Sequence, residues 1–99
     1  WAVVGDWMQH ERADYLVALC ANRLQDHEAA LHAARSGLRT IDRHGEEDVD
    51  RAFLLLELAR ACRGLGRGQE ADVARGQAMR LANSFSEDLR EEFARRAGA

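Results

Sequence analysis

Apolar side chains recur at helical spacing along five stretches of this chain, and short polar or glycine-containing breaks separate the stretches. Gly64, Gly66 and Gly68 make one such break. Asp26 offers a capping carboxylate in a second break, and Ser84 or Ser86 offers a capping hydroxyl in a third. The pattern predicts helices over residues 6–24, 27–44, 51–62, 69–83 and 87–97. An all-α chain without proline is consistent with this prediction.

The same pattern indicates which faces should be buried. The third stretch, RAFLLLELARAC, is apolar on most sides and should be the most buried helix. The first has an apolar stripe that we take as its inner face: Leu16, Val17, Cys20, Ala21 and Leu24. Cys20 and Cys62 both fall among apolar residues, so we expect two buried, unreactive thiols. The last stretch is amphipathic, with Leu89, Phe93 and Ala97 on one face.

Small residues repeat along the chain with a shift of 41 positions. The shift places Ala18 on Ala59, Ala30 on Ala71 and Gly37 on Ala78. Small side chains at matching positions of helical hairpins allow the helices, and then the hairpins, to approach closely. The sequence therefore predicts two helical hairpins followed by a lone final helix.

The segments GLGRGQEADVARGQAM and, less closely, RLQDHEAALHAARSGL resemble the turn and second helix of the tetratricopeptide repeat. The resemblance implies a first unit over about residues 11–43, a second over about 52–85 and a capping helix over about 86–97. It further implies a single domain in which the hairpins form a right-handed, α-solenoid-like stack. An unrelated five-helix bundle is the alternative arrangement of the same helices.

Composition narrows the class of function. All fourteen basic residues are arginine, which fits a GC-rich bacterial coding sequence, and the formal net charge of −3 argues against a nucleic-acid partner. No apolar run is long enough to span a membrane. Two isolated cysteines and the lack of a signal peptide favour the cytoplasm. The first residue is not methionine, so we expect a piece of a longer chain with neighbouring domains.

Candidate catalytic chemistry is sparse. The histidines supply at most pairs of ligands at helical spacing, Glu28 with His32 and His10 with Asp14, whereas a firm zinc site needs three or four. The acidic run EEDVD is explained by the positive end of a helix dipole. No nucleophile elbow, phosphate-binding loop or HExxH sequence occurs. We therefore expect no enzyme activity, no metal and no cofactor.

What remains is a binding surface. In the tetratricopeptide family the first helices of successive units line a concave groove, which implies that two sets of residues face it. The first unit contributes Arg12, Tyr15, Leu19, Asn22 and Arg23, and the second contributes Leu56, Arg60 and Arg63. The arginines would suit a peptide or protein partner that bears carboxylates.

The chain begins with a cluster of apolar residues: Trp1, Val3, Val4, Trp7 and Met8. These residues could cap the first hairpin, form the seam of a homodimer or dock on another domain. Two functions therefore stay open at this point. One is a protein-interaction module that uses the groove, and the other is a structural unit for homodimerisation or spacing without an external ligand.

Overall fold

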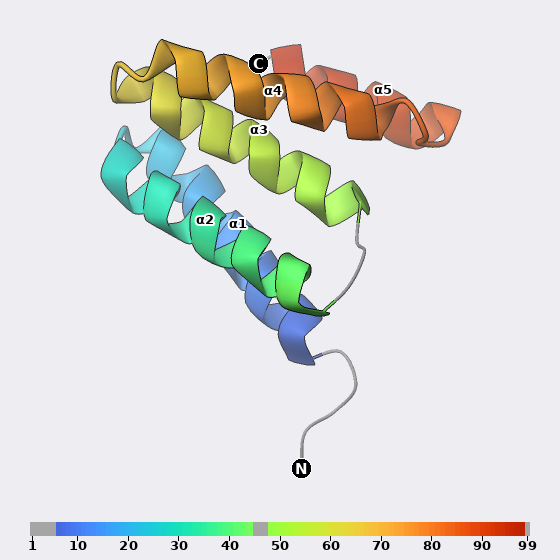
Figure 1. Cartoon of the computed structure of the whole chain (residues 1–99), viewed down its shortest axis with the longest axis horizontal. Coiled ribbons are helices and arrows are strands. Elements are labelled where there is room, and N and C mark those ends of the chain that lie inside the picture. The colour runs from blue at the N-terminus through green and yellow to red at the C-terminus, as the bar shows by residue number, and fades with distance from the viewer. Residues whose placement is uncertain (1–5, 45–47, 99) are drawn as a thin grey trace.

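The computed structural model describes residues 6–44 and 48–98, and all regular structure in those ranges is helical. Five helices follow one another along the chain (Figure 1): α1 (Asp6–Arg23), α2 (His27–His44), α3 (Asp48–Gly64), α4 (Gly68–Ala82) and α5 (Glu87–Gly98). The predicted all-α class and the five helices are confirmed. The third helix begins three residues before the predicted start, so part of the acidic run forms its first turn.

The turns α1–α2 and α3–α4 are built alike, 41 residues apart. Gln25 and Gly66 both adopt the left-handed conformation, with φ of 62° and 79°. The amide of Asp26 donates to the carbonyl five residues back at 2.8 Å, and the amide of Arg67 makes the same bond at 2.7 Å. This pattern is the Schellman motif, which satisfies carbonyls at a helix end. The repeat seen in the sequence is therefore present in the backbone hydrogen bonds.

Side-chain caps begin two of the helices. The carboxylate of Asp26 accepts a hydrogen bond from the amide of Ala29 at 3.3 Å, as predicted. The hydroxyl of Ser86 accepts one from the amide of Leu89 at 3.4 Å, which selects Ser86 over Ser84. These contacts satisfy amides that the first turn of a helix leaves without a partner.

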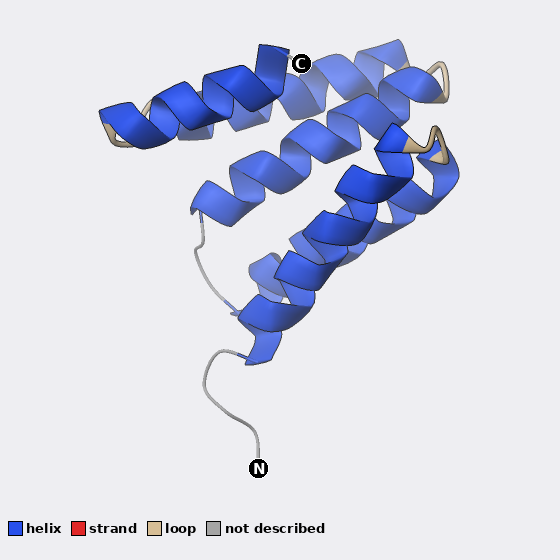
Figure 2. Ribbon diagram, turned by 180° about the vertical axis from the view of Figure 1, so that it is seen from behind, coloured by secondary structure: helices blue, strands red, loops and turns tan. Residues whose placement is uncertain are grey.

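The helices stack as hairpins in chain order. α1 packs against α2 and α3 against α4, while α2 and α1 both pack on α3. Figures 1 and 2 show the α1–α2 hairpin on one side of α3, with α4 and α5 on the other. α3 is thus covered from both sides and carries eight buried residues, which confirms that it is the most buried helix.

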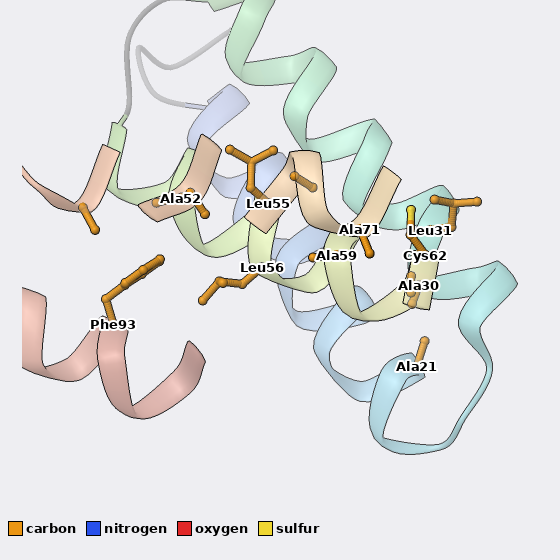
Figure 3. Close-up of a cluster of buried hydrophobic side chains, with 14 of the residues drawn as sticks. Ala21, Ala30, Leu31, Ala52, Leu55, Leu56, Ala59, Cys62, Ala71 and Phe93 are labelled. Atoms are coloured by element: carbon orange, nitrogen blue, oxygen red, sulfur yellow. The ribbon is translucent and has the colours of Figure 1, made fainter. Parts of the chain in front are cut away.

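Alanine dominates the core. Of the twenty buried hydrophobic residues described, twelve are alanine, and Ala18 and Ala59 are both buried as the repeat predicts. Figure 3 shows Ala30 and Ala71 beside the larger side chains of the cluster. A Cβ added to Gly37 would lie 2.9 Å from a methyl group of Leu54, so α2 and α3 touch there without room for one more carbon.

The predicted inner face of α1 is wrong for four of its five residues, and Ala21 alone is buried as predicted. Leu16, Val17 and Leu24 are exposed, at 57%, 53% and 80% of their surface. Cys20 on the same side is also exposed, so only Cys62 is a buried thiol. α1 instead turns its small residues inward, because the close helix approach at Ala18 and Ala21 leaves no space for leucine.

Candidate partner-binding face

α1, α3 and α5 line a continuous face with three hollows, which we call the α1–α3–α5 face. The first hollow is about 270 Å³, and its lining includes Arg12, Tyr15, Phe53, Leu89, Glu92 and Arg96. The second is about 260 Å³, lined by Leu19, Asn22, Arg23, Glu57, Arg60 and Arg96. The third is about 350 Å³, and its lining includes His27, Leu56, Arg60, Arg63, Arg75 and Ala97. Arg96 joins the first hollow to the second, and Arg60 joins the second to the third.

The structure brings all eight sequence-predicted groove residues to this face. Arg12 and Tyr15 line the first hollow. The second hollow receives four of them: Leu19, Asn22, Arg23 and Arg60. Leu56 and Arg63 line the third, where Leu56 is only 2% exposed and forms floor rather than rim. The sequence did not indicate Phe53 of α3. It did not indicate Glu92 or Arg96 either, because the pattern predicts a solvated outer face for α5.

Aromatic rings form the wall of the first hollow. The rings of Tyr15 and Phe53 meet edge to face, with centroids 6.2 Å apart, and Phe53 meets the buried ring of Phe93 in the same way at 5.4 Å. The Arg96 guanidinium lies 5.7 Å from the Phe53 centroid, and its Nη1 donates to the Tyr15 hydroxyl at 2.6 Å. A chain of ring contacts therefore runs from α1 through α3 to α5 along the first hollow.

These contacts shift the pKa values of two side chains in the first hollow, Tyr15 and Glu92. Burial raises the pKa of the Tyr15 phenol above its ordinary value of 10.0, although the charge of Arg96 acts in the opposite direction. Hydrogen bonds from Arg95, and then from Arg96, lower the pKa of the Glu92 carboxyl. Arg96 reaches Glu92 through Nε at 3.2 Å. Arg96 thus ties the phenol of α1 to the carboxylate of its own helix.

A polar network lies beneath the second hollow. The Glu57 carboxylate is 1% exposed and accepts hydrogen bonds from Asn22 Nδ2 at 3.0 Å and from Arg60 Nη1 at 2.5 Å. Asn22 also donates to the Glu57 carbonyl at 2.9 Å, and its Oδ1 lies 3.1 Å from His27 Nδ1. Because Asn22 uses its amide group as donor, His27 is the donor in the last contact. Asn22 and Arg60 therefore satisfy a buried charge, which is an internal role.

The end of α5 is held by arginines of its neighbours. Arg60 donates to the carbonyl of Arg96, and Arg75 donates to the carbonyl of Ala97 at 3.1 Å. Both carbonyls belong to the last turn of the helix, where intrahelical partners run out and where positive charge is favoured. These bonds place the α5 terminus over α3 between the second and third hollows.

Two rim arginines of the face, Arg12 and Arg63, are in ion pairs at the surface. Arg12 Nε lies 3.4 Å from Asp50, and Arg63 Nη2 lies 2.9 Å from Asp72. The two arginine side chains are 60% and 62% exposed. Exposed pairs of this kind contribute about 0–1 kcal/mol, so a ligand carboxylate could exchange with either partner.

Of the N-terminal apolar cluster, Trp1, Val3 and Val4 lie outside the described residues, and the structure does not describe the Met8 side chain. Trp7 stacks on His44, with centroids 5.4 Å apart and planes 8° apart. That contact joins the start of α1 to the end of α2.

The described residues include candidate metal ligands and a buried thiol, Cys62. Residues 6–44 and 48–98 contain no group of three or more His, Cys, Asp or Glu side chains arranged to hold a metal ion. Burial raises the pKa of the Cys62 thiol, which disfavours the reactive thiolate. Among the same residues, no helix is long and apolar enough to cross a bilayer.

No protein-family model matches this chain, and searches of curated proteins and of solved structures likewise find no match. The functional argument therefore rests on the geometry of the α1–α3–α5 face.

Proposed function

We propose that the chain is a protein-interaction module of the tetratricopeptide-like type, and that it binds a peptide segment of another protein on the α1–α3–α5 face. The observation that carries the proposal is the continuity of the three hollows along helices from both hairpins and α5. Stacked helical hairpins commonly present such a surface to extended or helical ligands. The role is one of binding without catalysis, in the cytoplasm.

The first hollow is the anchor site of this proposal. Its walls are the rings of Tyr15 and Phe53 together with Leu89. The rest of its lining is charged: Glu11, Asp50 and Glu92 with Arg12 and Arg96. A volume of about 270 Å³ accommodates one large apolar side chain of a ligand. Burial of such a side chain contributes about 1.5–3 kcal/mol. An aliphatic or aromatic ligand residue therefore supplies most of the affinity.

The adjoining arginines favour acidic residues beside that anchor. Arg12, Arg23 and Arg63 are exposed on the three hollows, and a guanidinium binds a carboxylate through two parallel hydrogen bonds. Arg60 is a poor ligand contact because it already neutralises buried Glu57. The expected ligand is a segment with one large apolar residue flanked by Asp or Glu.

The test is affinity capture from an extract of the source cells, followed by binding measurements with peptides from the captured protein. Tyr15→Ala removes the wall of the first hollow, and Arg63→Glu reverses a rim charge without touching Glu57. The matched control is Arg39→Glu, since Arg39 is an exposed α2 residue that lines none of the three hollows. All variants are checked for helicity by circular dichroism.

We expect the parent and Arg39→Glu to capture the same protein, and Tyr15→Ala to lose it. Arg63→Glu should weaken binding of an acidic peptide several-fold, and the loss should shrink as salt rises. Equal capture by the parent and by folded Tyr15→Ala would exclude the face as the binding site. It would leave the purely structural function, a spacer or dimerisation unit, as the better account.

A further inference from the structure

α1 carries an exposed apolar stripe on a side that lines none of the three hollows. We call it the α1 stripe, and its members are Ala13, Leu16, Val17, Cys20 and Leu24. Five large apolar side chains of the described residues are well exposed, and three of them lie on this stripe. Such a concentration on one helix face marks an interaction surface.

The internal repeat shows that the equivalent surface of the second hairpin is buried. Forty-one residues later, Leu54 and Ala61 stand where Ala13 and Cys20 stand in α1, and both are fully buried. Leu58, the equivalent of Val17, packs against alanines of the preceding hairpin. In the second hairpin, therefore, this face of the first helix is covered by another helix. In α1 the same positions have no such cover.

The spacing of the stripe favours a second copy of this chain as the cover. Ala13, Val17, Cys20 and Leu24 are spaced by four, three and four residues, which is the spacing of a seam between two helices. The order four, three, four reads the same in both directions. An antiparallel pair of α1 helices therefore sets Ala13 opposite Leu24 and Val17 opposite Cys20, so that each larger side chain meets a smaller one.

A head-to-tail contact fits less well. The other end of the stack is the outer surface of α4 and α5, where Val73 and Met79 are exposed but polar residues outnumber them: Gln69, Gln77 and Arg80 on α4, and Glu91 and Arg95 on α5. Docking the α1 stripe there would bury charged groups against apolar ones, at a cost in desolvation. Among the described residues, three of the five large exposed apolar side chains lie on the stripe and two on α4, so the stripe is the better apolar match for itself.

We propose that the α1 stripe is the contact of a two-fold symmetric homodimer, with the α1 helices antiparallel. The seam is about 17 Å long, because eleven residue steps of an α-helix rise 1.5 Å each. A seam of one helix from each copy is smaller than the interface of a stable dimer, so the dissociation constant should be on the order of 100 µM. Arg12 and Arg23 lie along one margin of the α1 stripe. Antiparallel pairing sets this margin of one copy against the same margin of the other, so the arginines repel one another, and salt screens that repulsion. Higher salt should therefore strengthen the dimer.

Sedimentation equilibrium of the whole chain tests the proposal over concentrations that bracket this constant. Val17→Glu places a charge in the seam and should weaken dimerisation by about 10-fold or more. Val73→Glu is the matched control, because Val73 on α4 is the same residue type with 57% exposure against 53% for Val17. It should leave the association unchanged. Both sites are exposed, so both variants should fold.

Thiol cross-linking tests whether the α1 stripe is the contact, because a seam along the stripe brings the two Cys20 side chains close together. Cys20 is exposed and Cys62 is buried, so a short bismaleimide should join two copies through Cys20 alone. The antiparallel seam predicts a covalent dimer and no larger species, and Cys20→Ser should abolish it. The proposal is overturned if the parent is monomeric at all concentrations and salt levels. Equal weakening by both glutamate variants, or a stable dimer that Cys20 does not cross-link, would also overturn it.

Discussion

At the scale of single residues, the two equivalent turns differ in one respect that can be measured. Gln25 holds the left-handed conformation that Gly66 holds in the second turn. A side chain in that conformation costs about 1–2 kcal/mol, and glycine avoids this cost. Gln25→Gly should therefore raise the free energy of unfolding by about 0.5–1 kcal/mol, after allowing for the greater freedom of glycine in the unfolded chain.

Gly66→Gln is the reciprocal variant, and it should lower the free energy of unfolding by about 1 kcal/mol. Urea unfolding followed by circular dichroism measures both changes. If Gln25→Gly destabilised the protein, the left-handed geometry of the first turn would be refuted. The sequence predicted the glycine turn directly, whereas only the 41-residue repeat could have indicated the same conformation at a glutamine.

The failure at Leu16, Val17 and Leu24 also has a residue-scale cause. α1 has two apolar sides, and helical period alone does not tell which one faces the core. The predicted inner face combines the larger side chains with Ala21, and of these only Ala21 is buried. The closely packed α1–α2 pair accepts alanine instead, so Ala18 and Ala21 are buried. Side-chain size outweighs hydrophobicity wherever two helices approach at a small-residue crossing.

At the scale of helices, the close approach of α2 and α3 at Gly37 leads to a testable prediction. An alanine Cβ there would lie 2.9 and 3.0 Å from the two methyl groups of Leu54 and 3.3 Å from the Cβ of Asp14. Leu54 is fully buried and cannot swing away. Gly37→Ala should therefore lower the free energy of unfolding by about 1–2 kcal/mol, because overpacking exceeds the gain in helix propensity.

Gly76→Ala in α4 is the control, since nothing lies within 4 Å of the added carbon. It should raise stability by about 0.5–1 kcal/mol through helix propensity alone. Thermal and urea unfolding of the two variants give the comparison. Two stabilised variants would mean that α2 and α3 are farther apart than the structure places them.

For the final helix, α5, the sequence predicts the apolar face but not the partners of its polar side chains. Its apolar face was read correctly from spacing, and Phe93 is 1% exposed while Leu89 and Ala97 are half-buried. The position of Arg96 was not predictable, because its partners Tyr15 and Phe53 are far away in the chain. Local periodicity fixes which side of a helix is apolar, but the partners of a polar side chain depend on how the hairpins stack.

At the scale of the whole molecule, the same limit applies to the candidate site. The groove residues of α1 and α3 could be predicted because the hairpin repeat assigns the first helices to one face. The hollows exist only because α5 closes the same face, and they were therefore not visible before the stack was known. Tyr15, the one tyrosine in the chain, lies where α1, α3 and α5 meet and can report on that assembly.

Burial raises the native pKa of Tyr15 above 10.0, so absorbance at alkaline pH should show the phenol titrating later in the folded chain than in the denatured chain. Because the folded-state pKa is the higher one, the stability linked to this group is fully present below the unfolded pKa. It is lost as the pH rises through the native pKa. In Arg96→Gln, loss of the neighbouring positive charge should raise the native pKa further, because Phe93 still holds α5 against Phe53. Arg39→Gln should leave it unchanged. A fall toward 10.0 in Arg96→Gln would instead show that Arg96 itself keeps α5 in place, and that the first hollow opens when this one side chain is removed.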